Sequence, residues 1–202
     1  MQFLSRLLRR LMILRAGASG IGSRRTATAH HPYVLKNPVI GFLNLLGERG
    51  AALAESDSRA LADLFVDCRS SGSEVPQCAV LLIYCQVDAS GRIEGVSESL
   101  RGLIKRAGAH VAILASENEP QACINAMKAR NDWTANVVFV LNRKGPIFAE
   151  FFRRLFEMMG QGTSMPSAWV KISPQIPHYD NPDAPEAIFA AEAGHLTFSK
   201  RA

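Results

Sequence analysis

The sequence predicts an α/β domain with a mainly parallel sheet between two layers of helices, a three-layer sandwich. Three short runs of consecutive apolar residues predict strands covered on both faces, because a strand with one face in water alternates apolar with polar residues. A stretch with helical spacing follows each run, and strands that alternate with helices form parallel sheets through crossover connections. The expected strands cover residues 79–85, 111–115 and 136–141.

Helix breakers and capping residues set the bounds of the expected helices. Asn37-Pro38 opens the first, Ser97 is expected to cap the third, and Pro120 suits the first turn of the fourth. Gly160 and Gly162 close the last. The expected helices cover residues 39–47, 58–68, 97–107, 120–129 and 147–159.

The length of 202 residues suits one folded unit with tails. We expect a basic amphipathic or flexible segment over 1–36, the α/β domain over 37–175 and a C-terminal tail over 176–202. The tail is rich in Pro, Asp and Asn, and it could add a hairpin or an extra edge strand around Ala193-Gly194.

The net charge of +5 is concentrated at the N-terminus. Seven basic residues and no acidic one precede Glu48, while sixteen basic and eighteen acidic residues lie from Glu48 onward. The folded region is therefore close to neutral, and no nucleic-acid groove is expected. No apolar run is long enough to span a bilayer, so we expect no integral membrane protein.

The N-terminal segment allows three interpretations. Residues 2–15 place leucines on one helical face and arginines on the other, which suits contact with a membrane surface or a partner. The Arg-rich, acid-free stretch that follows is typical of a mitochondrial transit peptide, and an incidental disordered start is the third option. The expected location is accordingly cytoplasmic, or the mitochondrial matrix if the segment is a transit peptide.

Neither a metal nor a cofactor is expected. The four cysteines form no CxxC pair and have no His at ligand spacing, so we expect reduced thiols rather than a zinc site or disulfides. The Gly-rich stretch 17–22 does not have the glycine spacing of a dinucleotide-binding turn, and no strand is expected before it.

Polar side chains follow each of the three strands, where ligands collect in open parallel sheets. A thiol nucleophile needs a base, but His110, the nearest His to Cys85, is expected at the opposite edge, so Cys85 is interpreted as a core residue. Ser116 or Asn118 is explained as a helix cap, and Arg143-Lys144 as solvated residues in preference to an anion clamp. No catalytic residue is assigned; the candidate ligand rim comprises Gln86, Asp88, Ser116, Glu117, Asn142 and Arg143.

The last strand and helix resemble a known family. The strand 135–141 (ANVVFVL), the run FAEFF at 148–152, Gly162-Thr163-Ser164 and Ala168-Trp169 look like the closing elements of CHAT domains, relatives of the caspases. The resemblance implies a caspase-like sheet, within the same class as Rossmann-like folds. It also implies a catalytic His at about Gln86 and a Cys at about Ser116-Glu117, and neither residue is present.

Three functions follow as hypotheses. The first is a non-catalytic, caspase-like module that binds a protein partner or regulates one. The second is a small-molecule or nucleotide-binding enzyme that uses the rim. The third is an organelle-targeted or membrane-surface adaptor. Convergence of the rim residues on one cleft favours the second, whereas scattered rim residues and an exposed apolar patch elsewhere favour an adaptor.

Overall fold

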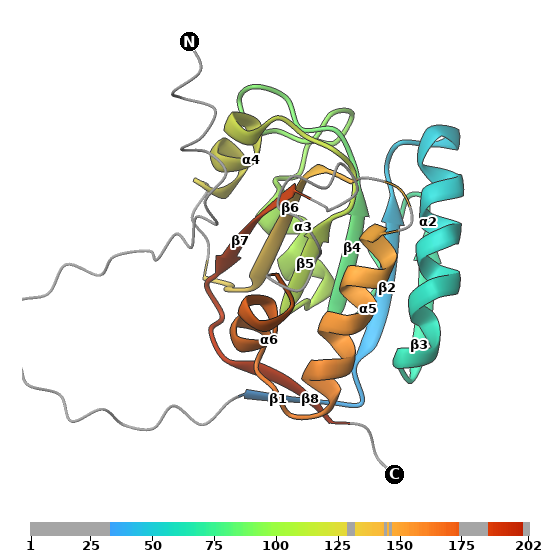
Figure 1. Cartoon of the computed structure of the whole chain (residues 1–202). Coiled ribbons are helices and arrows are strands. Elements are labelled where there is room, and N and C mark those ends of the chain that lie inside the picture. Colours follow the sequence, from blue (N-terminus) through green and yellow to red (C-terminus); the bar gives the residue numbers. More distant parts are fainter. Residues whose placement is uncertain (1–32, 129–131, 144, 146, 174–185, 200–202) are drawn as a thin grey trace, which may run out of the picture.

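The protein is an α/β domain built on a mainly parallel sheet, as predicted. The computed structural model describes residues 33–128, 132–143, 145, 147–173 and 186–199. Six strands form the main sheet in the order β3-β2-β4-β5-β6-β7; all neighbours are parallel except β7, which runs antiparallel to β6 (Figure 1). The strands are β2 (Val39–Asn44), β3 (Asp67–Ser71), β4 (Val80–Tyr84), β5 (Val111–Leu114), β6 (Asn136–Asn142) and β7 (Glu186–Ala191).

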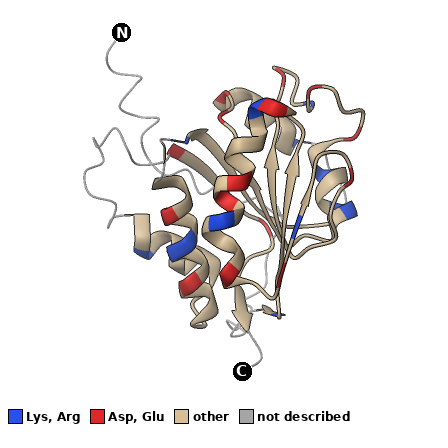
Figure 2. Cartoon of the chain, turned by 90° about the vertical axis from the view of Figure 1, so that its right-hand side faces the viewer, with Lys and Arg blue, Asp and Glu red and all other residues tan. Residues whose placement is uncertain are grey.

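Helices cover both faces of this sheet, as its edge-on view shows (Figure 2). The side chains of β4 alternate between two cores: Leu82 and Tyr84 join one, and Leu81 and Ile83 join the other. This division explains why the strand is apolar throughout. Helices α2 (Glu48–Leu61), α5 (Ile147–Gly160) and α6 (Met165–Ile172) pack on the first core, and α3 (Leu100–Ala107) and α4 (Pro120–Met127) pack on the second.

The prediction of a helix over residues 39–47 is wrong, because residues 39–44 form the central strand β2. Four consecutive residues of β2 are buried, and it lies between β3 and β4. Its apolar run therefore has the same cause as those of the other central strands. Asn37, which has a φ of 49°, and Pro38 interrupt the regular structure before β2.

The helix expected over 58–68 is displaced. Helix α2 starts one turn after β2, at Glu48, and a 3₁₀ turn (Ala62–Leu64) leads from it into β3. The polar sequence of β3, DCRSS, belongs to an edge strand with one neighbour, so it lacks the apolar pattern that reveals a central strand. Ser97 is not the cap of α3; Ser99 caps it and accepts a hydrogen bond from Gly102 N–H at 3.1 Å.

The C-terminal tail packs on the domain. Strand β7 adds an edge strand to the main sheet, while β8 (Leu196–Ser199) pairs in parallel with β1 (Tyr33–Lys36) in a second sheet. The two therefore form no hairpin with each other, and Phe189, Leu196 and Phe198 are buried in the first core. The expected helix over 2–15 lies outside the described residues. No helix within the described ranges is long and apolar enough to cross a membrane.

Candidate functional site

A cleft of about 640 Å³ opens at the carboxyl ends of the strands. The chain runs from β2 outward to β3 and then returns to β4 on the other side of β2, so the connections leave β2 and β4 in opposite directions. Such a reversal in strand order creates a crevice where ligands bind in open α/β sheets. The lining residues are Leu46, Leu53, Ser56, Asp57, Gln86, Ser116, Glu117, Asn142, Arg143, Gly145 and Ala149.

Five of the six predicted rim residues line this cleft: Gln86 after β4, Ser116 and Glu117 after β5, and Asn142 and Arg143 at the end of β6. Asp88 does not. Its carboxylate accepts hydrogen bonds from Ser90 Oγ at 2.7 Å, Ser90 N–H at 2.8 Å and Arg92 N–H at 2.9 Å, and the bond from the Ser90 hydroxyl is the largest effect that lowers the pKa of Asp88. Asp88 is therefore a turn residue.

Arg143 is not a solvated residue, contrary to the interpretation favoured from the sequence. Its side chain is 10% exposed, and Nη2 donates to Asp57 Oδ1 at 2.5 Å. Nη1 donates to Ala115 O at 2.8 Å, and the guanidinium lies 3.9 Å from the ring centre of Phe148. The charge of Arg143 is thus already paired within the protein, which removes the simple anion clamp that was the alternative.

Asp57 is the member of the site that sequence reasoning missed. It is fully buried on α2, where Oδ2 accepts a hydrogen bond from Tyr84 Oη at 2.6 Å. Burial raises the pKa of Asp57, although the hydrogen bond and charge of Arg143 act in the opposite direction. A signal was present: Leu53, Asp57 and Leu61 lie one helical turn apart, which places an acidic residue on the core-facing side of α2.

Ser116 and Asn118 link the ends of β4 and β5 through side-chain hydrogen bonds and are not helix caps. Ser116 Oγ accepts from Cys85 N–H at 2.9 Å and also donates to Cys85 O. Asn118 Oδ1 accepts from Val87 N–H at 2.7 Å, and its amide donates to Cys85 O and Ser116 O, both at 3.1 Å. The residue at the cap position of α4 is Glu119, whose side chain makes no capping bond.

Three polar side chains remain on the rim of the cleft. Glu117 is exposed, and its Oε1 accepts from Arg143 N–H at 2.8 Å. Gln86 is half-buried and donates to Glu117 O at 3.2 Å, which leaves its amide oxygen for other donors. Asn142 is half-buried at the end of β6. Amide and carboxylate groups from three strand ends therefore face one space with an apolar wall of Leu46, Leu53 and Ala149.

Cys85 lies in the core beneath this rim. The thiol is 1% exposed, and burial raises its pKa to about 12, so it stays protonated at neutral pH. Of the two described histidines, His110 lies at the amino end of β5 between the rings of Tyr33 and Trp133, and burial lowers its pKa. His195 contacts Ser164 near β8. Neither histidine lines the cleft.

A second hollow, of about 390 Å³, lies between α2 and β3. Its lining is mostly small side chains of α2 and β3, and it contains none of the predicted rim residues. Within the described part of the chain, no group of three or more His, Cys, Asp or Glu side chains is arranged to hold a metal ion. The cleft at the carboxyl ends is therefore the candidate site.

Comparison of the chain with protein families and with curated protein sequences gave no match. The resemblance to CHAT domains stays a prediction from the residues quoted above.

Proposed function

We propose that this protein is a non-catalytic, caspase-like regulatory domain that binds a small polar molecule in the cleft at the carboxyl ends of β4, β5 and β6. The observation that carries the ligand-binding part of the proposal is convergence, which favours a small-molecule site: side chains that follow three separate strands, Gln86, Glu117 and Asn142 among them, line one cleft. The caspase-like part rests on the resemblance, and the non-catalytic part on the absence of its His and Cys at the matching positions. A cleft of about 640 Å³ is in the range of small-molecule sites, which combine apolar walls with a few polar groups.

Peptidase chemistry with a thiol and an imidazole is not supported at this cleft. A nucleophilic Cys must be able to form a thiolate beside a base, but Cys85 is buried and has a pKa of about 12. The hydroxyl of Ser116 is engaged with both backbone groups of Cys85. Binding without bond cleavage is the simpler use of these side chains.

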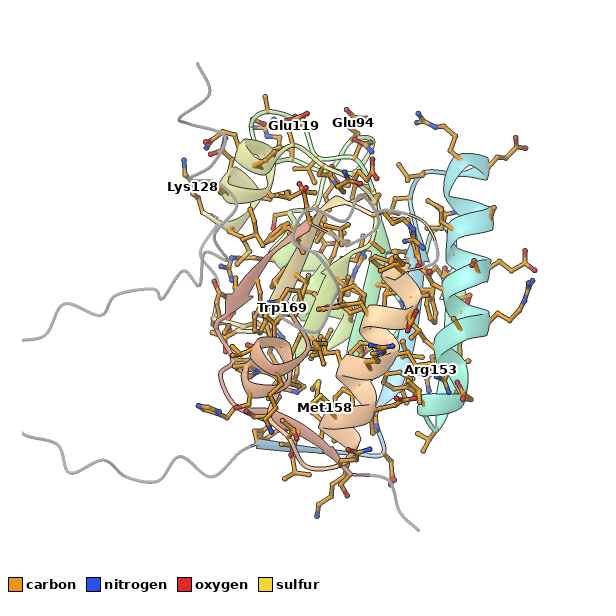
Figure 3. The ribbon with its side chains drawn as sticks, in the orientation of Figure 1. Glu94, Glu119, Lys128, Arg153, Met158 and Trp169 are labelled. Carbon is orange, nitrogen blue, oxygen red and sulfur yellow. The ribbon has the colours of Figure 1, made fainter. Side chains whose placement is uncertain are left out.

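The charges of the lining favour a neutral or cationic ligand. Asp57 pairs with Arg143, so Glu117 contributes the remaining charge among the described lining side chains. Glu94 and Glu119 also lie at the end of the molecule where the carboxyl ends of β4, β5 and β6 are found (Figure 3). Opposite charge favours a ligand and like charge disfavours it. Polyphosphates and nucleotides are therefore poor candidates, and polar molecules with amine, amide or hydroxyl groups are better ones.

The test is a thermal-shift screen of the full chain against neutral and cationic polar metabolites, with nucleotides as the anionic comparison. We expect a hit to raise the melting temperature of the parent and to bind about tenfold more weakly to Gln86→Ala and Asn142→Ala, as expected for one lost hydrogen bond. Asp88→Ala is the matched control, because Asp88 also follows β4 but lies outside the cleft. Hits that bind all four proteins equally would contradict the proposal.

A protein partner and a location in the mitochondrial matrix or at a membrane surface also belong to this proposal. They are supported by the composition of residues 2–31 and not by the cleft. The regulatory role implies that ligand binding is passed on to such a partner.

A further inference from the structure

We propose that Asp57 occupies, from within the chain, a carboxylate-binding site in the cleft, and that it determines the charge selectivity of the cleft. The site consists of the guanidinium of Arg143 and the hydroxyl of Tyr84. The inference rests on the cleft of the proposed function and specifies how that cleft excludes anions.

The two donors bind the Asp57 carboxylate as they would bind a ligand. Arg143 Nη2 donates to Oδ1 at 2.5 Å and Tyr84 Oη donates to Oδ2 at 2.6 Å, so each carboxylate oxygen has its own donor. One donor comes from the end of β6, the other from the last residue of β4, and the acceptor from α2. Hydrogen bonds to an ionised acceptor of this kind are among the stronger ones in proteins.

Arg143 does not depend on Asp57 for its position. Nη1 donates to Ala115 O at 2.8 Å, and the ring of Phe148 lies against the guanidinium, 3.9 Å away. Tyr84 is itself held in the central strand and is fully buried. Removal of the Asp57 carboxylate would therefore leave two donors in place, pointing at an empty space of carboxylate size.

In Asp57→Ala that space would adjoin the candidate site, since Asp57, although its side chain is fully buried, and Arg143 both line the cleft. In the wild type, the Asp57 carboxylate fills this space and neutralises the charge of Arg143. A second anion therefore has neither a free cation to bind nor space to occupy. Without that carboxylate, Arg143 carries an unpaired charge, which is costly in a buried position and favours capture of an anion. The identity of residue 57 thus decides whether the cleft accepts anions.

The test uses the full chain with Asp57→Ala, and formate as the probe because it is the smallest carboxylate. We expect the melting temperature of Asp57→Ala to rise with formate concentration more than with the same concentration of chloride. The wild type, whose site is filled, is expected to show no such difference. The double variant Asp57→Ala with Arg143→Met should lose the response, and Asp57→Asn, whose amide still fills the space, should respond weakly at most.

An Asp57→Ala protein that responds to formate no more than to chloride would overturn the inference, and so would an equal response from the Arg143→Met double variant. If Asp57→Ala does not fold in chloride, circular dichroism decides: recovery of the native spectrum in formate supports the site, and no recovery refutes it. The metabolite screen uses the wild type without added carboxylate. Failure of that screen therefore counts against the proposed function and leaves the assignment of Asp57 to the formate experiment.

Discussion

Replacement of Asn118 by Ala should destabilise the protein by about 2–3 kcal/mol, because its side chain is a buried link between β4 and β5. Asn118 is 7% exposed and makes three hydrogen bonds to the backbone of Cys85, Ser116 and Val87. Ser116 still donates to Cys85 O in the variant, so the main loss falls on Val87 N–H. A buried N–H left without an acceptor costs about 1–3 kcal/mol, and the two amide donors add a smaller amount.

The assay is urea unfolding followed by circular dichroism, with a thermal melt alongside. For a domain of this size, about 2–3 kcal/mol corresponds to a fall of roughly 4–12 °C in melting temperature. Asn125→Ala is the matched control: half-buried Asn125 donates to Ala89 O at 2.8 Å and accepts from Gln121 Nε2 at 3.2 Å, and both hydrogen bonds are exposed to solvent. We expect that variant to lose about 0.5 kcal/mol. Equal losses in the two variants would refute the reasoning that burial, and not the hydrogen bond alone, sets the cost.

Two further outcomes follow from buried side chains. Native protein at pH 8 should resist alkylation at Cys78, Cys85 and Cys123, because burial raises the pKa of these thiols to about 12 and leaves almost no thiolate. Peptide mass spectrometry measures the modification, and rapid alkylation of these residues before unfolding would contradict the prediction. Trp169 on α6, labelled in Figure 3, is 3% exposed and stacked on Phe189, and its Nε1–H has no acceptor among the described residues. Trp169→Phe should therefore lose less stability than the roughly 3–5 kcal/mol typical of truncating a buried aromatic to Ala, as urea unfolding of Trp169→Phe and Trp169→Ala would measure.

Strands β4, β5 and β6 and helices α3, α4 and α5 could be predicted from local sequence. The runs of β4, β5 and β6 are apolar without polar alternation, which requires cover on both faces of the sheet, and this requirement fixes the fold class. Helix α5 could also be predicted from the sequence, because its phenylalanines recur at helical spacing between Gly145 and Gly160. The same reasoning failed for β2 and β3. An apolar run is shared by buried strands and buried helices, and a polar edge strand has no pattern of its own.

The order of the strands could not be read locally. Strand β2 lies between β3 and β4 because it pairs with both of them. This pairing depends on the packing of α2 against the first core. The strand reversal beside β2 is what creates the cleft. Its existence was expected from a general rule for parallel sheets, but its position depends on tertiary structure.

The sequence by itself determined which polar residues follow the strands, because a strand's end is marked by the change from apolar to polar residues. Five of the six residues chosen on this basis line one cleft. Only the tertiary structure decided their states: Arg143 is paired and buried, Ser116 is a backbone link, and Asp88 faces its own turn. The partner of Arg143, Asp57, is 86 residues away in the chain. A charge can be recognised from sequence, but whether it is free or neutralised depends on what folding brings beside it.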